Sequence, residues 1–315
     1  MLIDLCYVTL GLAMLVFAGD ALVRGAVNFS LRLGIPALVV ALTVVAFGTS
    51  APEMLVSVKA VLADQPGIAL GNVVGSNIAN VLLVLGIPAL IATIHSSRLD
   101  LRRGYATMIA ATMLFIVLSL LGPITWWHAL ILLVGLGLML WDNYRATQVH
   151  RASVDLAATL EGADPSMPWW KISSFLAVGL IGLPIGADLL VESSVNIARV
   201  LGISETVIGL TLVAIGTSLP ELATSIAAAF RKQADVAMGN VIGSNVFNLL
   251  GIIGVAGLVG DLAVPAELLR SDLWVMLAVS LLLVPFVLMK RDITRGVGVG
   301  FIGLYAVYAT TLVLW

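Results

Sequence analysis

The strongest constraint on the fold of this chain is an internal repeat. Residues 42–86 recur as residues 210–254, and at this offset of 168 residues 22 of the 45 aligned positions are identical. The similarity continues upstream, where Asp20 aligns with Asp188 and Asn28 with Asn196. A repeat of this length predicts two homologous halves.

The composition is typical of a membrane protein. Of the 315 residues 60% are hydrophobic and 11% are charged, and the mean hydropathy is +1.11. Soluble domains are about 45–50% apolar and about 25% charged. Because a spanning helix needs roughly 20 apolar residues, the chain is predicted to be an all-α integral membrane protein. Its ten predicted spans lie at about residues 3–31, 36–62, 68–93, 103–122, 124–144, 169–199, 204–230, 236–259, 271–290 and 293–314.

Five of these spans fall in each half, and one polar segment joins the halves. The predicted organisation is a five-helix repeat at residues 1–144, a linker at 145–168 and a second five-helix repeat at 169–315. Since five is odd, the second half must enter the membrane from the opposite side. This inverted repeat is common among secondary transporters.

The basic residues indicate the orientation. Twelve of the 16 Lys and Arg residues fall in or beside the loops of one side: Arg32, Arg98, Arg102, Arg103, Arg145, Arg151, Lys171, Arg231, Lys232, Lys290, Arg291 and Arg295. The other side has three, Lys59, Arg199 and Arg270, and Arg24 lies within the first span. Positively charged loops remain cytoplasmic. The linker is therefore predicted to be cytoplasmic, with both termini outside.

Each half contains a motif that places a helix breaker and an acid in an apolar segment, G-T-S-x-P-E at residues 48–53 and 216–221. Proline lacks an N–H and clashes with the carbonyl four residues earlier, so each helix is predicted to break and to free carbonyl groups. In lipid, freed groups are tolerated only where protein or a water-filled cavity satisfies them. The predicted oxygen donors are Thr49, Ser50, Glu53, Thr217, Ser218 and Glu221, with carbonyls near Ala46–Gly48 and Ala214–Gly216.

A second motif, G-N-V-x-G-S-N-x-x-N, occurs at residues 71–80 and 239–248. Asn77, Ser76 and Asn80 share one helix face through their spacings of three and four residues, as do Asn245, Ser244 and Asn248. The glycines of the motif, Gly71, Gly75, Gly239 and Gly243, are predicted to let helices approach closely or distort. These faces add neutral oxygens to the predicted site.

Together the two motifs predict a site for hard cations near the middle of the membrane. Each feature alone also has a structural interpretation, as a satisfied acid, a kinked helix or a packing stripe. An ionisable residue inside the membrane is nevertheless a functional hypothesis by default, and here the feature recurs. Glu53 and Glu221 give the site a formal charge of −2, with Asn80 and Asn248 neutral. One Ca²⁺, two Na⁺ or two protons would balance that charge, and Ca²⁺ takes six to eight oxygen ligands.

Other classes of function find little support in the sequence. The only cysteine is Cys6, and His95, His128 and His150 lie at or beyond the predicted span ends, without a metalloprotease motif. No enzyme activity, no cofactor and no obligate protein partner is therefore expected. The net charge of −2 argues against a nucleic-acid partner. Membrane lipid and the transported ions are the expected partners.

The two repeated motifs resemble the α-repeats of the cation/calcium exchanger superfamily, and among its members the chain is most similar to prokaryotic sodium/calcium exchangers. This resemblance implies an ion-binding core of helices 2, 3, 7 and 8, against which helices 1 and 6 slide, and a prokaryotic inner (plasma) membrane location. It further implies that Glu53 and Glu221 are the central ligands. The carbonyls of Ala46 and Ala214 would bind sodium, Ser76 and Ser244 would complete outer sodium sites, and Asn80 would form a third corner. Some similar members carry Asp at the position of Asn248.

The counter-ion remains open at this point. A Na⁺/Ca²⁺ antiporter that uses alternating access is favoured, because hydroxyl-rich G-T-S segments occur in both halves. The family resemblance implies an exchange of three Na⁺ for one Ca²⁺. The alternatives are a Ca²⁺/H⁺ antiporter, in which both glutamates take protons, and, from another class, a cation channel. For Asp20 and Arg24 the expectation is a local ion pair, and the alternative places Asp20 and Asp188 at the mouths of two access pathways.

Overall fold

The computed structural model describes residues 2–35, 37–150, 164, 166–201 and 216–314. All elements in these ranges are helical. The first half contains α1 (Leu2–Leu33), α2 (Ala37–Val40), the π-helix η1 (Ala41–Val45), α3 (Ala46–Thr49), α4 (Ala51–Leu62), α5 (Pro66–Ala79), the π-helix η2 (Asn80–Val84), α6 (Gly86–Ile91), the 3₁₀ turn η3 (Ser96–Arg98), α7 (Arg102–Leu121) and α8 (Trp126–His150).

The second half is described at residues 169–201 and 216–314. It contains α9 (Trp169–Val200), α12 (Leu219–Phe230), α13 (Ala234–Val246), the π-helix η6 (Phe247–Ile252), α14 (Ile253–Val259), the π-helix η7 (Leu268–Asp272), α15 (Leu273–Leu281), α16 (Val284–Val287) and α17 (Arg295–Leu314). Six of the described helical segments are long and apolar enough to cross a membrane. The bent pair Ala37–Thr49 and Ala51–Leu62 makes a seventh.

The predicted spans coincide with helices or with chains of short helices wherever the structure describes them. One boundary differs clearly from the prediction, and another is not tested. Helix α8 continues to His150, into the segment predicted as linker. Span 204–230 is described only from Gly216, so its first half lies outside the described residues.

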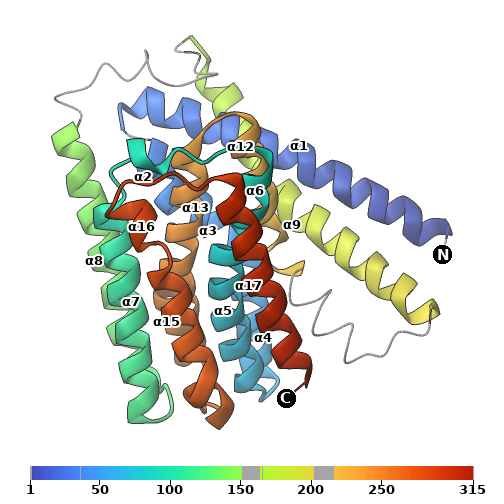
Figure 1. Ribbon diagram of the computed structural model, residues 1–315, viewed down its shortest axis with the longest axis vertical. Helices are drawn as coiled ribbons and strands as arrows, with labels where there is room; N and C mark the ends of the chain where they lie inside the picture. Colours follow the sequence, from blue (N-terminus) through green and yellow to red (C-terminus); the bar gives the residue numbers. More distant parts are fainter. Residues whose placement is uncertain (1, 36, 151–163, 165, 202–215, 315) are drawn as a thin grey trace.

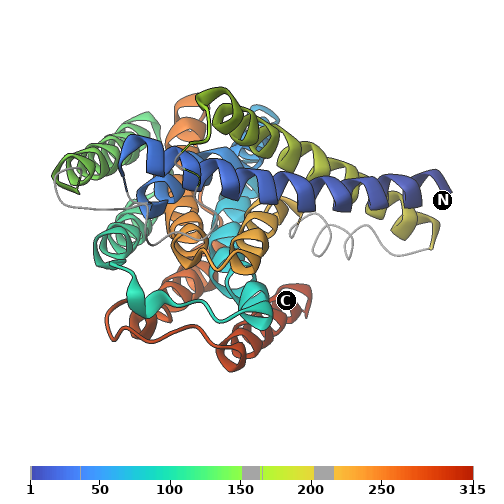
Figure 2. The ribbon, with the colours of Figure 1, turned by 90° about the horizontal axis from the view of Figure 1, so that it is seen from above.

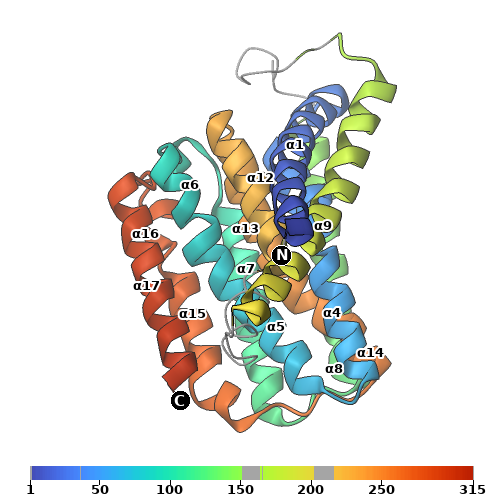
Figure 3. The ribbon, with the colours of Figure 1, turned by 90° about the vertical axis from the view of Figure 1, so that its right-hand side faces the viewer.

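Burial separates central from peripheral helices. The most apolar windows of segments Pro66–Ile91 and Ala234–Val259 are 78% and 89% buried, whereas those of α1 and α9 are only 22% buried. Figure 3 shows α5, α7 and α13 between the α1–α9 pair on one side and α15–α17 on the other. The segments that carry the second motif are therefore the centre of the protein, and α1 and α9 lie at its edge.

Helices α1 and α9 pack directly on each other through glycines. A Cβ atom at Gly11 would lie 2.8 Å from the carbonyl oxygen of Gly186, and one at Gly179 would lie 2.5 Å from Cβ of Leu22. Such close approach is typical of small-residue packing between membrane helices. The pair crosses the upright helices obliquely, and the N-terminal end of α1 extends beyond them (Figures 1 and 2).

Two isolated antiparallel bridges tie loops together. Ile94 pairs with Ile293, which joins the connection after α6 to the connection before α17. Ile124 pairs with Leu262, which joins the connection after α7 to the connection after α14. Loops that the alternation of spans assigns to the same side are thus in contact.

Candidate cation-binding site

The G-T-S-x-P-E motifs interrupt their helices as predicted. Helix α3 ends at Thr49, Ser50 leaves helical geometry (φ −83°, ψ 5°), and α4 begins at Ala51 with its axis bent by 44°. In the second copy Ser218 has nearly the same geometry (φ −92°, ψ 7°) and α12 begins at Leu219. The prolines fall in the first turn of the new helix, where a missing N–H does no harm.

This interruption places each glutamate at a helix N-terminus. Glu53 lies in the first turn of α4 and Glu221 in the first turn of α12. The partial positive charge of a helix N-terminus favours a carboxylate. Both side chains are nevertheless 0% exposed. Only groups in the interior of the protein can therefore stabilise them.

Two serines hold Glu221. The Ser50 hydroxyl of the first half donates a hydrogen bond of 2.9 Å to Oε1 of Glu221, and the Ser244 hydroxyl donates one of 3.5 Å to the same atom. The first motif of one half therefore contacts the carboxylate of the other half. Since Ser50 and Glu221 are 171 residues apart, only the tertiary fold brings them together.

The motif threonines also connect the halves. Thr49 donates its hydroxyl hydrogen to Oδ1 of Asn240 at 3.2 Å, and Thr217 donates to Oδ1 of Asn72 at 3.4 Å. Thr49 is also 3.3 Å from the carbonyl of Ala46, a second acceptor for its one hydrogen. With the hydrogen directed to these acceptors, the lone pairs of the Thr49 and Thr217 oxygens are available to a cation.

Asn72 and Asn240 were not among the predicted site residues. The amide of Asn72 donates to the backbone carbonyl of Glu53 at 3.2 Å and to the Ser57 hydroxyl at 3.1 Å. Asn240 makes the equivalent bonds to Glu221 at 3.3 Å and to Ser225 at 3.4 Å. A signal existed in the sequence, because both asparagines and both serines match at the repeat offset.

The oxygens of the site stand out as unpaired acceptors. Asn80 and Asn248 are both 0% exposed, like the glutamates. Among the described residues, the following buried atoms of the site have no hydrogen-bond partner: Glu53 Oε1 and Oε2, Glu221 Oε2, Asn80 Oδ1, Asn248 Oδ1 and Ser218 Oγ. A buried acceptor without a partner costs about 1–3 kcal/mol, and more for a charged group. Oxygen-only ligands of this kind suit hard cations such as Ca²⁺.

The π-helical turns position the asparagines. Asn80 is the first residue of η2, and Asn248 is the second residue of η6. Short π-helical turns within α-helices frequently occur at functional sites. The sequence pattern predicted a regular helix face here and did not predict these turns.

The remaining predicted ligands lie close by or outside the described residues. Ser76 is buried on α5, one turn before Asn80. The Ala46 carbonyl accepts the backbone N–H of Ser50 at 3.1 Å, so it is not wholly freed by the helix break. Ala214 lies outside the described residues.

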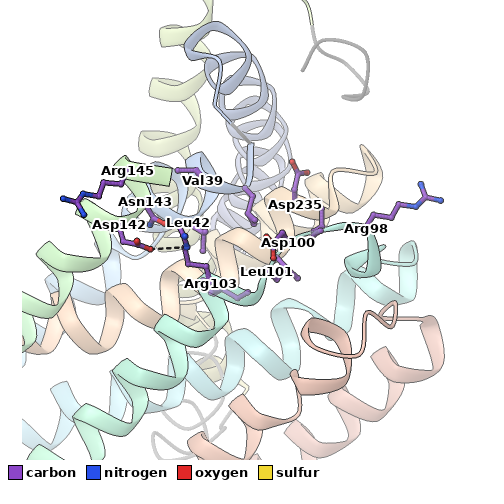
Figure 4. A pocket seen from close by; sticks show the side chains of 14 residues that line it. Val39, Leu42, Arg98, Asp100, Leu101, Arg103, Asp142, Asn143, Arg145 and Asp235 are labelled. Atoms are coloured by element: carbon purple, nitrogen blue, oxygen red, sulfur yellow. Dashed lines mark ion pairs between the residues drawn. The ribbon is translucent and has the colours of Figure 1, made fainter. Parts of the chain in front are cut away.

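One cavity of the described chain lies away from this site. It measures about 540 Å³ and lies between the N-terminus of α7 and the end of α8, where Arg103 pairs with Asp142 at 3.6 Å (Figure 4). None of the predicted ligands lines it.

Asp20 forms the expected ion pair with Arg24, at 3.0 Å. It also pairs with Arg231, at the C-terminal end of α12, which was not predicted. This contact links α1 to the helix that carries Glu221. Asp188 is exposed on α9.

Buried carboxylates and unpaired oxygens within a bundle of apolar helices are typical of proteins that carry cations across a membrane. Residues 3–143 and 172–314 match the family model described as sodium/calcium exchanger protein, so the chain belongs to the sodium/calcium exchanger family. It is therefore an integral membrane protein and a cation/Ca²⁺ exchanger.

Individual relatives agree with this assignment. The chain is 36% identical to CaxA of Alkalimonas amylolytica, described as a candidate antiporter, over 90% of this chain and 89% of the relative. It is 32% identical to the sodium/calcium exchanger MaX1 of Methanosarcina acetivorans, over 96% of each protein. The solved sodium-calcium exchanger NCX_Mj, soaked with Na⁺ and Ca²⁺, superposes with a TM-score of 0.85 over 99% of both chains, at 32% identity.

Proposed function

We propose that the chain is a secondary-active Na⁺/Ca²⁺ antiporter that works by alternating access. The observation that carries this proposal is the set of buried, unpaired oxygens on Glu53, Glu221, Asn80, Asn248 and Ser218. Two carboxylates and two amides can ligate one Ca²⁺ or a set of Na⁺ ions in competition. Because one site then serves both ions, their movements are coupled without any cofactor.

The proposed ligands are those of the repeated motifs. Glu53 and Glu221 are the central ligands, and amide, hydroxyl and carbonyl oxygens surround them: Asn80, Asn248, Thr49, Thr217, Ser50, Ser218, Ser76, Ser244, Ala46 and Ala214. The cross-half hydrogen bonds of Ser50 and of both threonines support this assignment. They keep oxygens from both halves around the two carboxylates.

The proposed architecture is ten spans in two inverted five-helix repeats, at residues 1–144 and 169–315, with a cytoplasmic linker at 145–168. Support comes from interactions that occur in pairs at the repeat offset. The bonds from Thr49 to Asn240 and from Thr217 to Asn72 are related in this way. The excess of basic residues in the loops of one side supports a cytoplasmic linker and external termini. The proposed location is a plasma membrane.

Purified protein in lipid vesicles tests the counter-ion. Vesicles loaded with Na⁺ and diluted into Na⁺-free medium should take up ⁴⁵Ca²⁺ several-fold faster than vesicles with equal Na⁺ on both sides. Each Na⁺ leaving down a tenfold gradient supplies about 1.4 kcal/mol. The matched control is a tenfold outward proton gradient without Na⁺.

Each outcome of that experiment has a definite meaning. Uptake that follows only the proton gradient would replace the proposal by a Ca²⁺/H⁺ antiporter. Uptake that needs neither gradient, with currents far above transporter turnover, would indicate a channel. Uptake that responds to Na⁺ alone supports the antiporter.

A further inference from the structure

We propose that Asn77 and Asn245 are positioning residues that turn the amide oxygens of Asn248 and Asn80, respectively, toward the transported cation. The inference rests on the proposed function, since it concerns the same site. Neither residue needs to touch the ion. Each acts on the asparagine that belongs to the other half of the chain.

The problem they solve is the ambiguity of a carboxamide. The two ends of an Asn side chain have almost the same shape, but one is an acceptor and the other a donor of two hydrogen bonds. Only the oxygen end can ligate a cation. An unconstrained Asn80 or Asn248 could present its NH₂ group instead, which would repel Ca²⁺ and Na⁺.

Two backbone carbonyls remove the ambiguity at the first step. Asn77 approaches the main-chain oxygen of Asn245 at 3.3 Å, and Asn245 approaches the main-chain oxygen of Asn77 at 3.3 Å. A carbonyl only accepts hydrogen bonds, so the side-chain end that faces it must be Nδ2. The opposite end of each of these two amides is therefore Oδ1.

Two thioethers strengthen this orientation. Nδ2 of Asn77 lies 3.7 Å from Sδ of Met276, and Nδ2 of Asn245 lies 3.7 Å from Sδ of Met108. Sulfur of this type is a weak acceptor. Both hydrogens of each NH₂ group are thus directed into the protein, at residues that are only 2% and 1% exposed.

The second step transfers the orientation to the site. Oδ1 of Asn245 lies 3.0 Å from Asn80, and Oδ1 of Asn77 lies 3.1 Å from Asn248. Because these oxygens only accept, the facing ends of Asn80 and Asn248 must be their nitrogens. Their own oxygens then point away from these bonds, and both are buried without a partner. The polarity of the site asparagines follows from two main-chain carbonyls.

The arrangement also couples the two halves. Asn77 of α5 orients Asn248 of η6. In the same way, Asn245 of α13 orients Asn80 of η2. A change at Asn245 should therefore alter the orientation of the Asn80 amide and leave the orientation of the Asn248 amide unchanged. This crossed pattern is specific to the positioning role.

The test uses the symmetry of a carboxylate, which presents an oxygen in either orientation. Asn245→Leu has similar volume but no acceptor, so Asn80 loses its orientation. We expect the Ca²⁺ concentration for half-maximal binding to rise about tenfold, the effect of one lost hydrogen bond near a charge. Adding Asn80→Asp should restore binding to near the wild-type concentration, because the introduced carboxylate needs no orientation and no longer faces Oδ1 of Asn245.

The matched control adds the same charge at the other corner. Asn248→Asp combined with Asn245→Leu should restore much less, since the Asn80 amide stays unoriented and the new carboxylate faces Oδ1 of Asn77. The mirrored set, Asn77→Leu with Asn248→Asp or with Asn80→Asp, should give the reverse result. A variant that merely misfolds would not regain Ca²⁺ binding from a carboxylate at one of these two positions and fail to regain it from a carboxylate at the other.

The measurements are equilibrium ⁴⁵Ca²⁺ binding to purified protein in detergent and Na⁺-driven ⁴⁵Ca²⁺ exchange in vesicles. Equal rescue from both corners, or unchanged binding in Asn245→Leu, would overturn the positioning role while wild-type exchange remains intact. Wild-type protein that fails to bind Ca²⁺ would instead overturn the proposed function together with this inference. Wild-type protein that binds Ca²⁺ without Na⁺-driven exchange removes only the Na⁺ coupling, and the binding data still decide the positioning role.

Discussion

Replacing either Glu53 or Glu221 by Gln should abolish Ca²⁺ exchange. A unit charge at 4 Å contributes about 4 kcal/mol to each unit of cation charge at an effective dielectric constant of 20. Both side chains are fully buried, so water cannot replace the lost charge. We expect Ca²⁺ binding to weaken more than about 100-fold, which corresponds to about 2.8 kcal/mol, and exchange in vesicles to fall to background.

The control for this result is Glu267→Gln, which removes a carboxylate from an exposed position before η7. It should leave both Ca²⁺ binding and exchange unchanged. Gln keeps the shape of Glu, so folding is preserved in all three variants, and size-exclusion chromatography checks this. Normal exchange by both Glu53→Gln and Glu221→Gln would refute the proposed site.

Gly243→Ala should have the second-largest effect, because it separates two segments that must touch. A Cβ atom at Gly243 would lie 2.6 Å from the carbonyl oxygen of Leu42 and 2.7 Å from Cβ of Ala46. These are main-chain and near-main-chain atoms that cannot rotate away. Helix α13 must therefore move off η1 and α3, which displaces Ser244 and Asn240 from Glu221 and Thr49.

The expected loss of stability is about 1–3 kcal/mol, the usual cost of overpacking. It should appear as a lower Tm in detergent, together with at least about tenfold slower exchange. The matched control is Gly300→Ala on α17, where an added Cβ meets no described atom within 4 Å. Gly243→Ala with normal Tm and exchange would show that α13 can shift without consequence for the ion site.

The prediction of close helix approach holds at two of the four motif glycines. Gly239 and Gly243 confirm it, since an added Cβ at Gly239 would lie 2.6 Å from Cβ of Ala41. At Gly71 and Gly75 no described atom lies within 4 Å of an added Cβ. The segment that the repeat aligns with residues 38–46 is 206–214, which lies outside the described residues.

Much of the architecture was predictable because membrane helices have strong signals. The length and apolarity of the spans and the helix breaks at proline are set locally, because every backbone polar group in lipid must be satisfied. The helix breaks at Ser50 and Ser218 were predicted for this reason and are present. The two glutamates were identifiable because a charge in an apolar segment requires an explanation.

The partners of the polar side chains were not predictable in the same way. The motif identified Asn77 and Asn80 as sharing a helix face, but their roles depend on Asn245, which is 168 and 165 residues away in the chain. The π-helical turns at Asn80 and Asn248 likewise depend on packing between helices. Local periodicity carries no information on either feature.

By itself, the sequence determined that this protein is a two-part membrane bundle with two acidic, oxygen-rich helix breaks, because composition, proline and charge act locally. Only the tertiary structure decided which oxygens are left unpaired for the proposed cation. That choice depends on hydrogen bonds between residues more than 160 positions apart, where a main-chain carbonyl of one half fixes the polarity of an amide in the other. Donor and acceptor ends of an Asn have the same shape, so only a neighbour brought close by folding can distinguish them.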